Sequence, residues 1–156
     1  MTTAIYPGTF DPPTLGHLDI ISRISRIFDK VVVGVVMNVG KNPMLDAEER
    51  VRLLGECVAP FPNVEVSSSD ELLADFAARY ENPVVVKGLR NQIDYEYETT
   101  MAVFNRRLSP ELETFFITAD REFTYLSSTA VRQLAAYGAD LSELVPEPVA
   151  KAIYKK

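Results

Sequence analysis

Short runs of β-branched residues alternate along the chain with longer segments in which apolar residues recur every three or four positions. The first pattern predicts strands and the second amphipathic helices, and their alternation is typical of a parallel sheet. Near-continuous apolar runs such as Val31-Val32-Val33 indicate strands that are covered on both faces. We expect five strands, at 3–6, 30–37, 64–67, 83–87 and 113–118.

Helical periodicity fills the intervening segments, and two helix-end signals support it. Asp46 followed by Glu49 resembles a capping box, and Gly138 stands where a helix ending near Tyr137 requires a left-handed residue. No fixed repeat, low-complexity segment or linker divides the chain, so we expect one α/β domain over 1–156. The apolar positions place the helices within 20–28, 47–58, 72–80, 97–108, 130–137 and 149–154.

Composition narrows the class of protein. Apolar residues make up 47% of the 156 positions, which is enough for one substantial core. No apolar run is long enough to span a bilayer and the N-terminus lacks the basic region of a signal peptide, so we expect a cytosolic protein. One cysteine and one histidine exclude a Cys/His zinc cluster, so a metal would be held mainly by oxygen. The net charge of −6 argues against general binding to nucleic acid or to an anionic membrane.

Ligands of open parallel sheets bind at the carboxyl ends of the strands. The loops expected at that edge are 8–17, 38–41, 88–90 and 119–129. A local basic site for phosphate is available there, because four cations lie in or just beyond such loops: Lys41, Lys87, Arg90 and Arg132.

The first of these loops combines features of an anion site. Gly8 and Gly16 let the backbone approach a ligand closely, and the following helix start offers free amide donors. His17 extends from the first helical turn toward the same place. Alternatively, the glycines and prolines only mark a turn and His17 is a surface histidine. Lys41 is open to a similar alternative, since most lysines are simply solvated.

The later loops add cations and hydroxyls. Lys87 and Arg90 flank a glycine, a pattern that suits phosphate but also suits ordinary salt bridges at a strand end. Glu98 either accepts hydrogen bonds from a ribose or pairs with a nearby cation. The hydroxyl-rich segment 123–129 precedes a helix, where it caps the helix or surrounds a phosphate. Arg132 opposes the dipole of that helix, so an anionic ligand would account for it better than helix stability does.

Three motifs together carry a family resemblance. They are Tyr-Pro-Gly-Thr-Phe-Asp-Pro-x-Thr-x-Gly-His at 6–17, Lys-Gly-Leu-Arg at 87–90 followed by Asp-Tyr-Glu-Tyr-Glu, and Ser-Ser-Thr at 127–129. In order and spacing the chain resembles the phosphopantetheine adenylyltransferase family, within the nucleotidyltransferases that carry a (T/H)xGH motif. The resemblance covers nearly the whole chain. It implies a Rossmann-like fold, with an open five-stranded parallel sheet flanked by helices.

The resemblance also implies a reaction, the penultimate step of coenzyme A synthesis. ATP and 4′-phosphopantetheine would give dephospho-coenzyme A and pyrophosphate, with Mg²⁺, by direct in-line attack. The attacking phosphate is already an anion and needs no general base, so alignment and charge stabilisation suffice. The family further implies a homohexamer and coenzyme A as a possible inhibitor, and no metal-ligating residue can be named.

Site residues follow from the matching motif positions. His17 would stabilise charge at the α-phosphate, and Thr9, Lys41 and Arg90 would complete the catalytic set. Phosphopantetheine would be held by Thr9, Lys41, Leu73 and Lys87. ATP would be bound by Gly8, Thr9, Phe10, His17, Gly88, Leu89, Arg90, Glu98, Phe123, Thr124, Tyr125, Leu126, Ser127, Ser128 and Thr129.

Two positions depart from the family pattern, and other functions compete. Lys87 stands where arginine is common, which keeps the charge but loses a bidentate grip, and Thr129 replaces a frequent serine. The nearest alternative is a nicotinate mononucleotide adenylyltransferase or a cytidylyltransferase, although Thr14 and Lys-Gly-Leu-Arg favour phosphopantetheine. A non-catalytic nucleotide sensor would not need both His17 and Lys41. A Walker-type NTPase is excluded, because the chain contains no Gly-x-x-x-x-Gly-Lys-Ser/Thr segment.

Overall fold

The computed structural model describes residues 1–37 and 42–156 and contains the five expected strands in one parallel sheet. The strand order is β3-β2-β1-β4-β5, and all four neighbouring pairs run parallel. The Rossmann-like prediction is therefore confirmed, with strand ends that differ from the expected ones by at most two residues. The strands are β1 Thr3–Gly8, β2 Lys30–Val36, β3 Val64–Ser69, β4 Pro83–Leu89 and β5 Glu113–Thr118.

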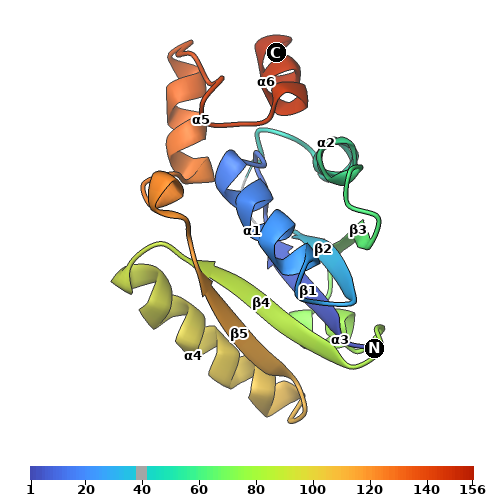
Figure 1. Cartoon of the computed structure of the whole chain (residues 1–156). Helices are drawn as coiled ribbons and strands as arrows, with labels where there is room; N and C mark the ends of the chain where they lie inside the picture. The colour runs from blue at the N-terminus through green and yellow to red at the C-terminus, as the bar shows by residue number, and fades with distance from the viewer. Residues whose placement is uncertain (38–41) are drawn as a thin grey trace.

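Helices connect and cover these strands (Figure 1). The Asp46–Glu49 capping box is present at the start of α2, and Gly138 has the left-handed backbone with φ 71°. The helix expected at 72–80 is shorter, because α3 covers only Leu73–Ala77. The helix expected at 97–108 begins earlier, at Gln92, because Asn91 caps it by accepting from the Asp94 amide. The helices are α1 Leu15–Ser25, α2 Ala47–Val58, α3 Leu73–Ala77, α4 Gln92–Leu108, α5 Ser128–Ala136 and α6 Glu147–Tyr154, with a short 3₁₀ helix at Arg121–Phe123.

Buried side chains form a layer on each face of the sheet and a third cluster beyond its edge. Ile20, Ile21 and Ile24 of α1 pack on one face with Val31 and Val33. On the other face Phe76 of α3 and its neighbours pack against Ile5, Val32 and Val85. A third cluster joins α2 to α5 and α6, which lie together at the top of Figure 1. Strands β1 and β2 are thus covered on both faces, as the continuous apolar run of β2 predicted, whereas the edge strand β5 is largely exposed.

The sheet opens between its first and fourth strands. Their pairing covers only Thr3 to Ile5 on β1 and Pro83 to Val85 on β4, although both strands continue beyond these residues. The strand order also reverses here, since the chain proceeds from β1 outward through β2 and β3 before returning to β4. A reversal of strand order in an open parallel sheet creates a crevice at the carboxyl ends of the two strands. The fold therefore places a binding crevice between the carboxyl ends of β1 and β4.

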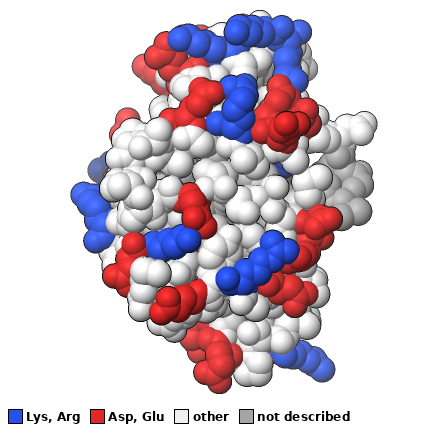
Figure 2. Space-filling view, turned by 90° about the vertical axis from the view of Figure 1, so that its right-hand side faces the viewer, with Lys and Arg blue, Asp and Glu red and all other residues white. Residues whose placement is uncertain are grey.

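Charges of both signs are interspersed over the face that Figure 2 shows. Several charged side chains of α2 form ion pairs, including Arg52 with Glu56 on the same helix and Glu49 with Lys156, which follows α6. Among the described residues, no helix is both long and apolar enough to cross a membrane.

Candidate active site

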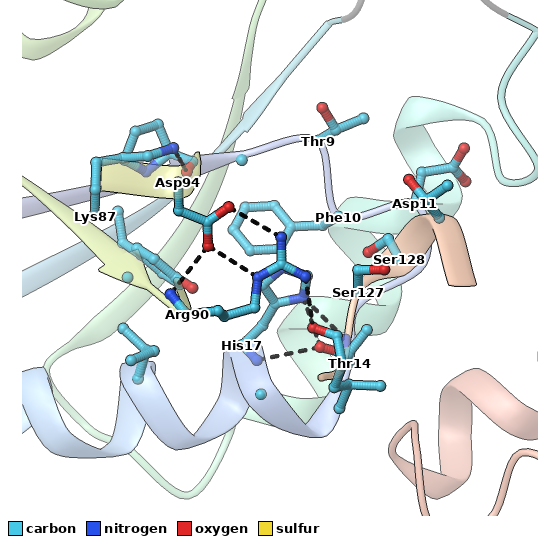
Figure 3. A pocket seen from close by; sticks show the side chains of 18 of the residues that line it. Thr9, Phe10, Asp11, Thr14, His17, Lys87, Arg90, Asp94, Ser127 and Ser128 are labelled. Atoms are coloured by element: carbon cyan, nitrogen blue, oxygen red, sulfur yellow. Dashed lines mark hydrogen bonds and ion pairs between the residues drawn. The ribbon is translucent and has the colours of Figure 1, made fainter. Parts of the chain in front are cut away.

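A cavity of about 460 Å³ lies at the carboxyl ends of β1 and β4 (Figure 3). Three of the four expected loops contribute to it, and for the fourth loop, 38–41, only the flanking residues are described. Its lining residues are Tyr6, Pro7, Gly8, Thr9, Phe10, Asp11, Thr14, Gly16, His17, Ile20, Met37, Asn42, Pro43, Arg50, Lys87, Gly88, Arg90, Asp94, Glu98, Ala119, Phe123, Leu126, Ser127, Ser128, Thr129 and Arg132.

Asp11 fixes the first loop to the segment that leads into α2. Its two carboxylate oxygens accept hydrogen bonds from the amides of Met44, at 2.9 Å, and Leu45, at 2.8 Å. Asp11 is only 5% exposed, so these bonds satisfy a buried carboxylate. Its backbone carbonyl accepts a further bond from Arg132 Nη1 at 2.6 Å. This contact gives Arg132 a partner within the chain, in addition to any anion it could bind.

Phe10 turns the loop back over the end of β1. Its backbone has φ 51°, a left-handed conformation that is uncommon for a bulky residue, and its side chain is buried. The ring lies edge-on to His17 with centroids 4.8 Å apart, and edge-on to Tyr6 at 5.7 Å. A Cβ atom on Gly8 would lie 3.0 Å from two carbons of this ring. Gly8 is therefore required for the packing of Phe10, as well as for any approach of a ligand.

His17 is the third residue of α1, and its side chain takes part in the helix cap. Thr14 Oγ1 accepts from the His17 amide at 3.3 Å, and His17 Nδ1 accepts from the Thr14 amide at 3.0 Å. Burial, followed by the positive charges of Lys87 and Arg90, lowers the pKa of His17 from 6.5 to about 4. The imidazole is thus neutral near pH 7 with Nδ1 as an acceptor, which leaves its proton on Nε2. His17 is held as a neutral hydrogen-bond donor in the wall of the cavity.

Lys87 and Glu98 form an ion pair across the wall of the cavity. Lys87 Nζ lies 3.5 Å from Glu98 Oε1 and donates to the Pro7 carbonyl at 3.3 Å. Of the two possibilities for Glu98, the structure shows the pairing with a cation. Through these contacts Lys87 joins β4 to the end of β1 and to α4.

Arg90 is held by Asp94, one helical turn further along the chain (Figure 3). Its Nε donates to Asp94 Oδ2 at 3.0 Å and its Nη2 to Oδ1 at 3.2 Å, while the Arg90 amide also donates to Oδ2. Burial alone would raise the pKa of Asp94, but the hydrogen bonds and charge of Arg90 bring it below the usual value. Arg90 Nη1 donates to the Leu126 carbonyl at 3.0 Å and so connects the fourth-strand loop to the last one.

The hydroxyls at the start of α5 are already engaged within the chain. Ser127 Oγ caps the helix by accepting from the Ala130 amide at 3.1 Å. Ser128 Oγ donates to the Pro12 carbonyl at 2.7 Å, and Thr129 Oγ1 accepts from Arg132 Nη2 at 3.2 Å. The capping interpretation is therefore correct for Ser127, and Ser128 braces the first loop.

Most of the described residues that were expected at the site line the cavity, but four do not. Leu89, Thr124 and Tyr125 lie outside its lining, and Leu73 packs against the cluster around Phe76. Lys41 lies outside the described residues. Their proposed contacts with ATP or phosphopantetheine stay predictions.

The charged lining residues that sequence reasoning did not assign to the site include Asp94 and Arg50. Asp94 had a detectable signal, since it stands four residues after Arg90 at a helix start, where an acidic and a basic side chain can pair. Arg50 is 2% exposed, and its Nη1 donates to the Thr9 carbonyl at 2.8 Å. That contact joins residues 41 positions apart and has no local signal.

Comparisons with known proteins agree with this arrangement. The cytidylyltransferase-like family model matches residues 5–134. A phosphopantetheine adenylyltransferase of Hahella chejuensis is 48% identical over 156 residues, covering 100% of this chain and 97% of that protein. One from Alkaliphilus metalliredigens is 47% identical, covering 100% of this chain and 99% of that protein.

A solved structure with lower sequence identity supports the fold. A candidate nicotinate-nucleotide adenylyltransferase from Vibrio parahaemolyticus superposes with a TM-score of 0.74 at 20% identity, covering 99% of this chain and 92% of that one. At this identity the likeness concerns the fold alone, whereas the full-length relatives carry the family. The chain belongs to the cytidylyltransferase-like family and, within it, to the phosphopantetheine adenylyltransferases.

Proposed function

We propose that this enzyme transfers the adenylyl group of ATP to 4′-phosphopantetheine, giving dephospho-coenzyme A and pyrophosphate. The single observation that carries the proposal is a neutral His17, with its proton on Nε2, in a cavity that Lys87 and Arg90 also line. A neutral donor beside fixed cations suits a reaction in which negative charge shifts at phosphorus. The identity of the acceptor is supported by the relatives that share the whole length of the chain.

The reaction needs little from the protein beyond alignment and charge. A phosphate oxygen of the acceptor forms a bond to the α-phosphorus as the bond from that phosphorus to pyrophosphate breaks. The attacking oxygen is already ionised, so no proton must be removed. His17 would donate from Nε2 to an α-phosphate oxygen, while Lys87 and Arg90 would bind phosphate oxygens. Removal of one such donor typically lowers the rate by roughly 10²- to 10³-fold.

Mg²⁺ would enter with ATP rather than occupy a protein cage. The described residues contain no group of three or more His, Cys, Asp or Glu side chains that could hold a metal. The carboxylates that line the cavity are also engaged, Asp11 by two amides, Asp94 by Arg90 and Glu98 by Lys87. Mg²⁺ commonly keeps water ligands and binds nucleotide phosphates, which fits this arrangement.

A substrate panel for pyrophosphate release tests the function. The purified protein, ATP and Mg²⁺ are incubated with 4′-phosphopantetheine, nicotinate mononucleotide or nicotinamide mononucleotide, and with CTP in place of ATP. We expect release with ATP and phosphopantetheine only. Release with a mononucleotide acceptor but not with phosphopantetheine would replace this proposal by the alternative within the superfamily.

We also propose that copies of the chain assemble through the outer face of α4 and β5, in a hexamer as in the family. Of the 17 residues of α4, only Asn105 is buried. The exposed large apolar side chains of these two elements are Ile93, Tyr95, Tyr97, Met101, Val103, Phe104, Leu108, Phe115 and Phe116. Patches of this kind on soluble proteins mark interaction surfaces. Light scattering should give the mass of six chains, and Phe104→Glu should reduce it.

Two further proposals concern regulation and location. Coenzyme A contains the product of the reaction as part of its structure, so it should compete for the same cavity. Inhibition that is relieved by added phosphopantetheine would support this, and inhibition independent of phosphopantetheine would point to another site. A cytosolic location is proposed because ATP is the donor, and cell fractionation tests it.

A further inference from the structure

Arg50 is a buried charged residue of α2 that lines the cavity, and its position in the helix does not explain why a charge is buried there. It is 2% exposed and lines the cavity. Its hydrogen bonds go to two backbone carbonyls, Thr9 at 2.8 Å from Nη1 and Asp46 at 3.3 Å from Nε. Across 1–37 and 42–156, Arg50 takes part in none of the ion pairs that the structure forms.

A buried guanidinium without a carboxylate partner is costly. Buried charges in proteins are ordinarily paired, and carbonyl dipoles compensate a full charge only in part. Helix stability does not favour the position either, because Arg50 ends the first turn of α2, where the helix dipole favours negative charge. The cost indicates that the charge serves a group that enters the cavity.

The contact with Thr9 lies at a sensitive point of the first loop. The carbonyl that Arg50 binds immediately precedes Phe10, whose left-handed backbone requires surrounding structure to hold it. Thr9 lines the cavity. A shift of its carbonyl would therefore move the Thr9 hydroxyl as well.

Arg50 is one of three cations that bind backbone carbonyls at the end of β1 and in the loop after it. Each cation comes from a different element and binds one carbonyl of this segment, and the three carbonyls belong to every second residue from Pro7 to Asp11. The three contacts are Lys87 of β4 on Pro7 at 3.3 Å, Arg50 of α2 on Thr9 at 2.8 Å, and Arg132 of α5 on Asp11 at 2.6 Å.

We propose that Arg50 is a positioning residue for adenylyl transfer, which holds Thr9 in place for the acceptor phosphate and supplies uncompensated positive charge to anions in the cavity. The positioning role rests on the proposed function. The charge role concerns any phosphate-bearing ligand of this cavity.

Steady-state kinetics of Arg50→Met and Arg50→Lys test the positioning role. The loss of a hydrogen bond from a charged group predicts that Arg50→Met lowers kcat/KM for phosphopantetheine by about 10- to 100-fold. Arg50→Lys, which keeps the charge, should recover part of this loss. In a Thr9→Ala background, Arg50→Met should lower kcat/KM by less than a further threefold, because the hydroxyl that Arg50 positions is already absent. Arg52→Met is the matched control, since Arg52 is exposed on the same helix and pairs with Glu56.

Calorimetry with pyrophosphate tests the charge role without any turnover. Arg50→Met should weaken pyrophosphate binding at least tenfold, and Arg52→Met should not. The proposal is overturned if a folded Arg50→Met protein keeps kcat, both KM values and pyrophosphate affinity within twofold of wild type. It is also overturned if the decrease in kcat/KM of the double variant equals the product of the decreases caused by Arg50→Met and Thr9→Ala alone. If Arg50→Met does not fold, the same double-mutant comparison with Thr9→Ala is made with Arg50→Lys. A wild-type protein that fails to use phosphopantetheine refutes the proposed function, whereas the pyrophosphate measurement still decides the role of Arg50.

Discussion

The Thr14 amide donates to His17 Nδ1 at 3.0 Å, and this contact explains the spacing of the Thr-x-Gly-His motif. Thr14 is the N-cap of α1 and His17 is the third helical residue, the two positions that a capping box links. The usual glutamate of a capping box is replaced by an imidazole, so the cap also sets the tautomer. Helix initiation and the orientation of the donor are therefore one structural feature.

The imidazole of His17 should titrate far below the usual range. Burial and the charges of Lys87 and Arg90 lower its pKa to about 4 in the folded protein. His17 is the only histidine, so its ring protons can be followed by NMR without assignment. We expect a midpoint near 4 in the folded protein and near 6.5 in urea. A folded midpoint near 6.5 would show that burial and the two cations do not act on the imidazole as the structure indicates.

The same shift predicts how stability depends on pH. Between pH 6.5 and about 4 the unfolded chain binds a proton at His17 that the folded chain does not bind. The contribution of the neutral His17 to the free energy of unfolding is thus fully present above pH 6.5 and is lost as the pH falls toward 4. Unfolding free energies measured over this range should fall less steeply for His17→Gln than for wild type. Equal slopes would show that His17 does not contribute.

Substitution of His17 should affect turnover far more than ATP binding. His17→Ala removes the donor at Nε2, and we expect kcat to fall at least 100-fold, on the order of a lost charge-stabilising group. Calorimetry should still detect ATP binding. Thr14→Ser keeps the cap and its amide bond to Nδ1, so it should remain close to wild type. Unchanged turnover in His17→Ala would remove His17 from the mechanism.

The sequence predicted those features that depend on local pattern. Strand positions followed from runs such as 31–33, and the capping box at Asp46 followed from spacing. The placement of Gly8 to His17 beside Lys87 and Arg90 followed from a general rule, because parallel strands bring their carboxyl ends to one edge.

Contacts between distant segments could not be predicted in the same way. The bond from Arg50 to Thr9 and the clamp of Asp11 on Met44 and Leu45 depend on how α2 packs against the first loop. The left-handed backbone of Phe10 depends on the space that Gly8 leaves for its ring. These features arise from tertiary packing, which periodicity does not record.

Substitution of Asp11 should destabilise the protein more than its loop position suggests. Asp11→Ala leaves the buried amide of Leu45 and the part-buried amide of Met44 without acceptors, at a cost of up to roughly 1–3 kcal/mol for each. Asp11→Asn keeps one acceptor and should cost less. Urea unfolding at a fixed protein concentration measures both, with the exposed Asp70→Ala as the control. A free energy of unfolding for Asp11→Ala equal to that of the control would show that water replaces the carboxylate.

Asp94→Asn should weaken ATP binding through Arg90. The carboxylate holds Nε and Nη2 of Arg90 together with its amide, and Nη1 is held by the Leu126 carbonyl. This leaves the remaining N–H groups of a fixed guanidinium for phosphate oxygens. An asparagine offers one oxygen, so the guanidinium loses its two-point support, and we expect KM for ATP to rise about tenfold.

The control for Asp94→Asn is Glu96→Gln, which removes a negative charge from the same helix. Glu96 is exposed, and among the described residues its carboxylate bonds only Gln92. A loss of helix stability through the dipole would affect the melting temperature of both variants and KM of neither. In an Arg90→Lys background, Asp94→Asn should have little further effect on KM, because the planar fork that Asp94 orients is absent. Since the pKa of Asp94 lies below its usual value, the KM of wild type should stay constant through the neutral range. Full additivity of the two substitutions would show that Asp94 acts on ATP independently of Arg90.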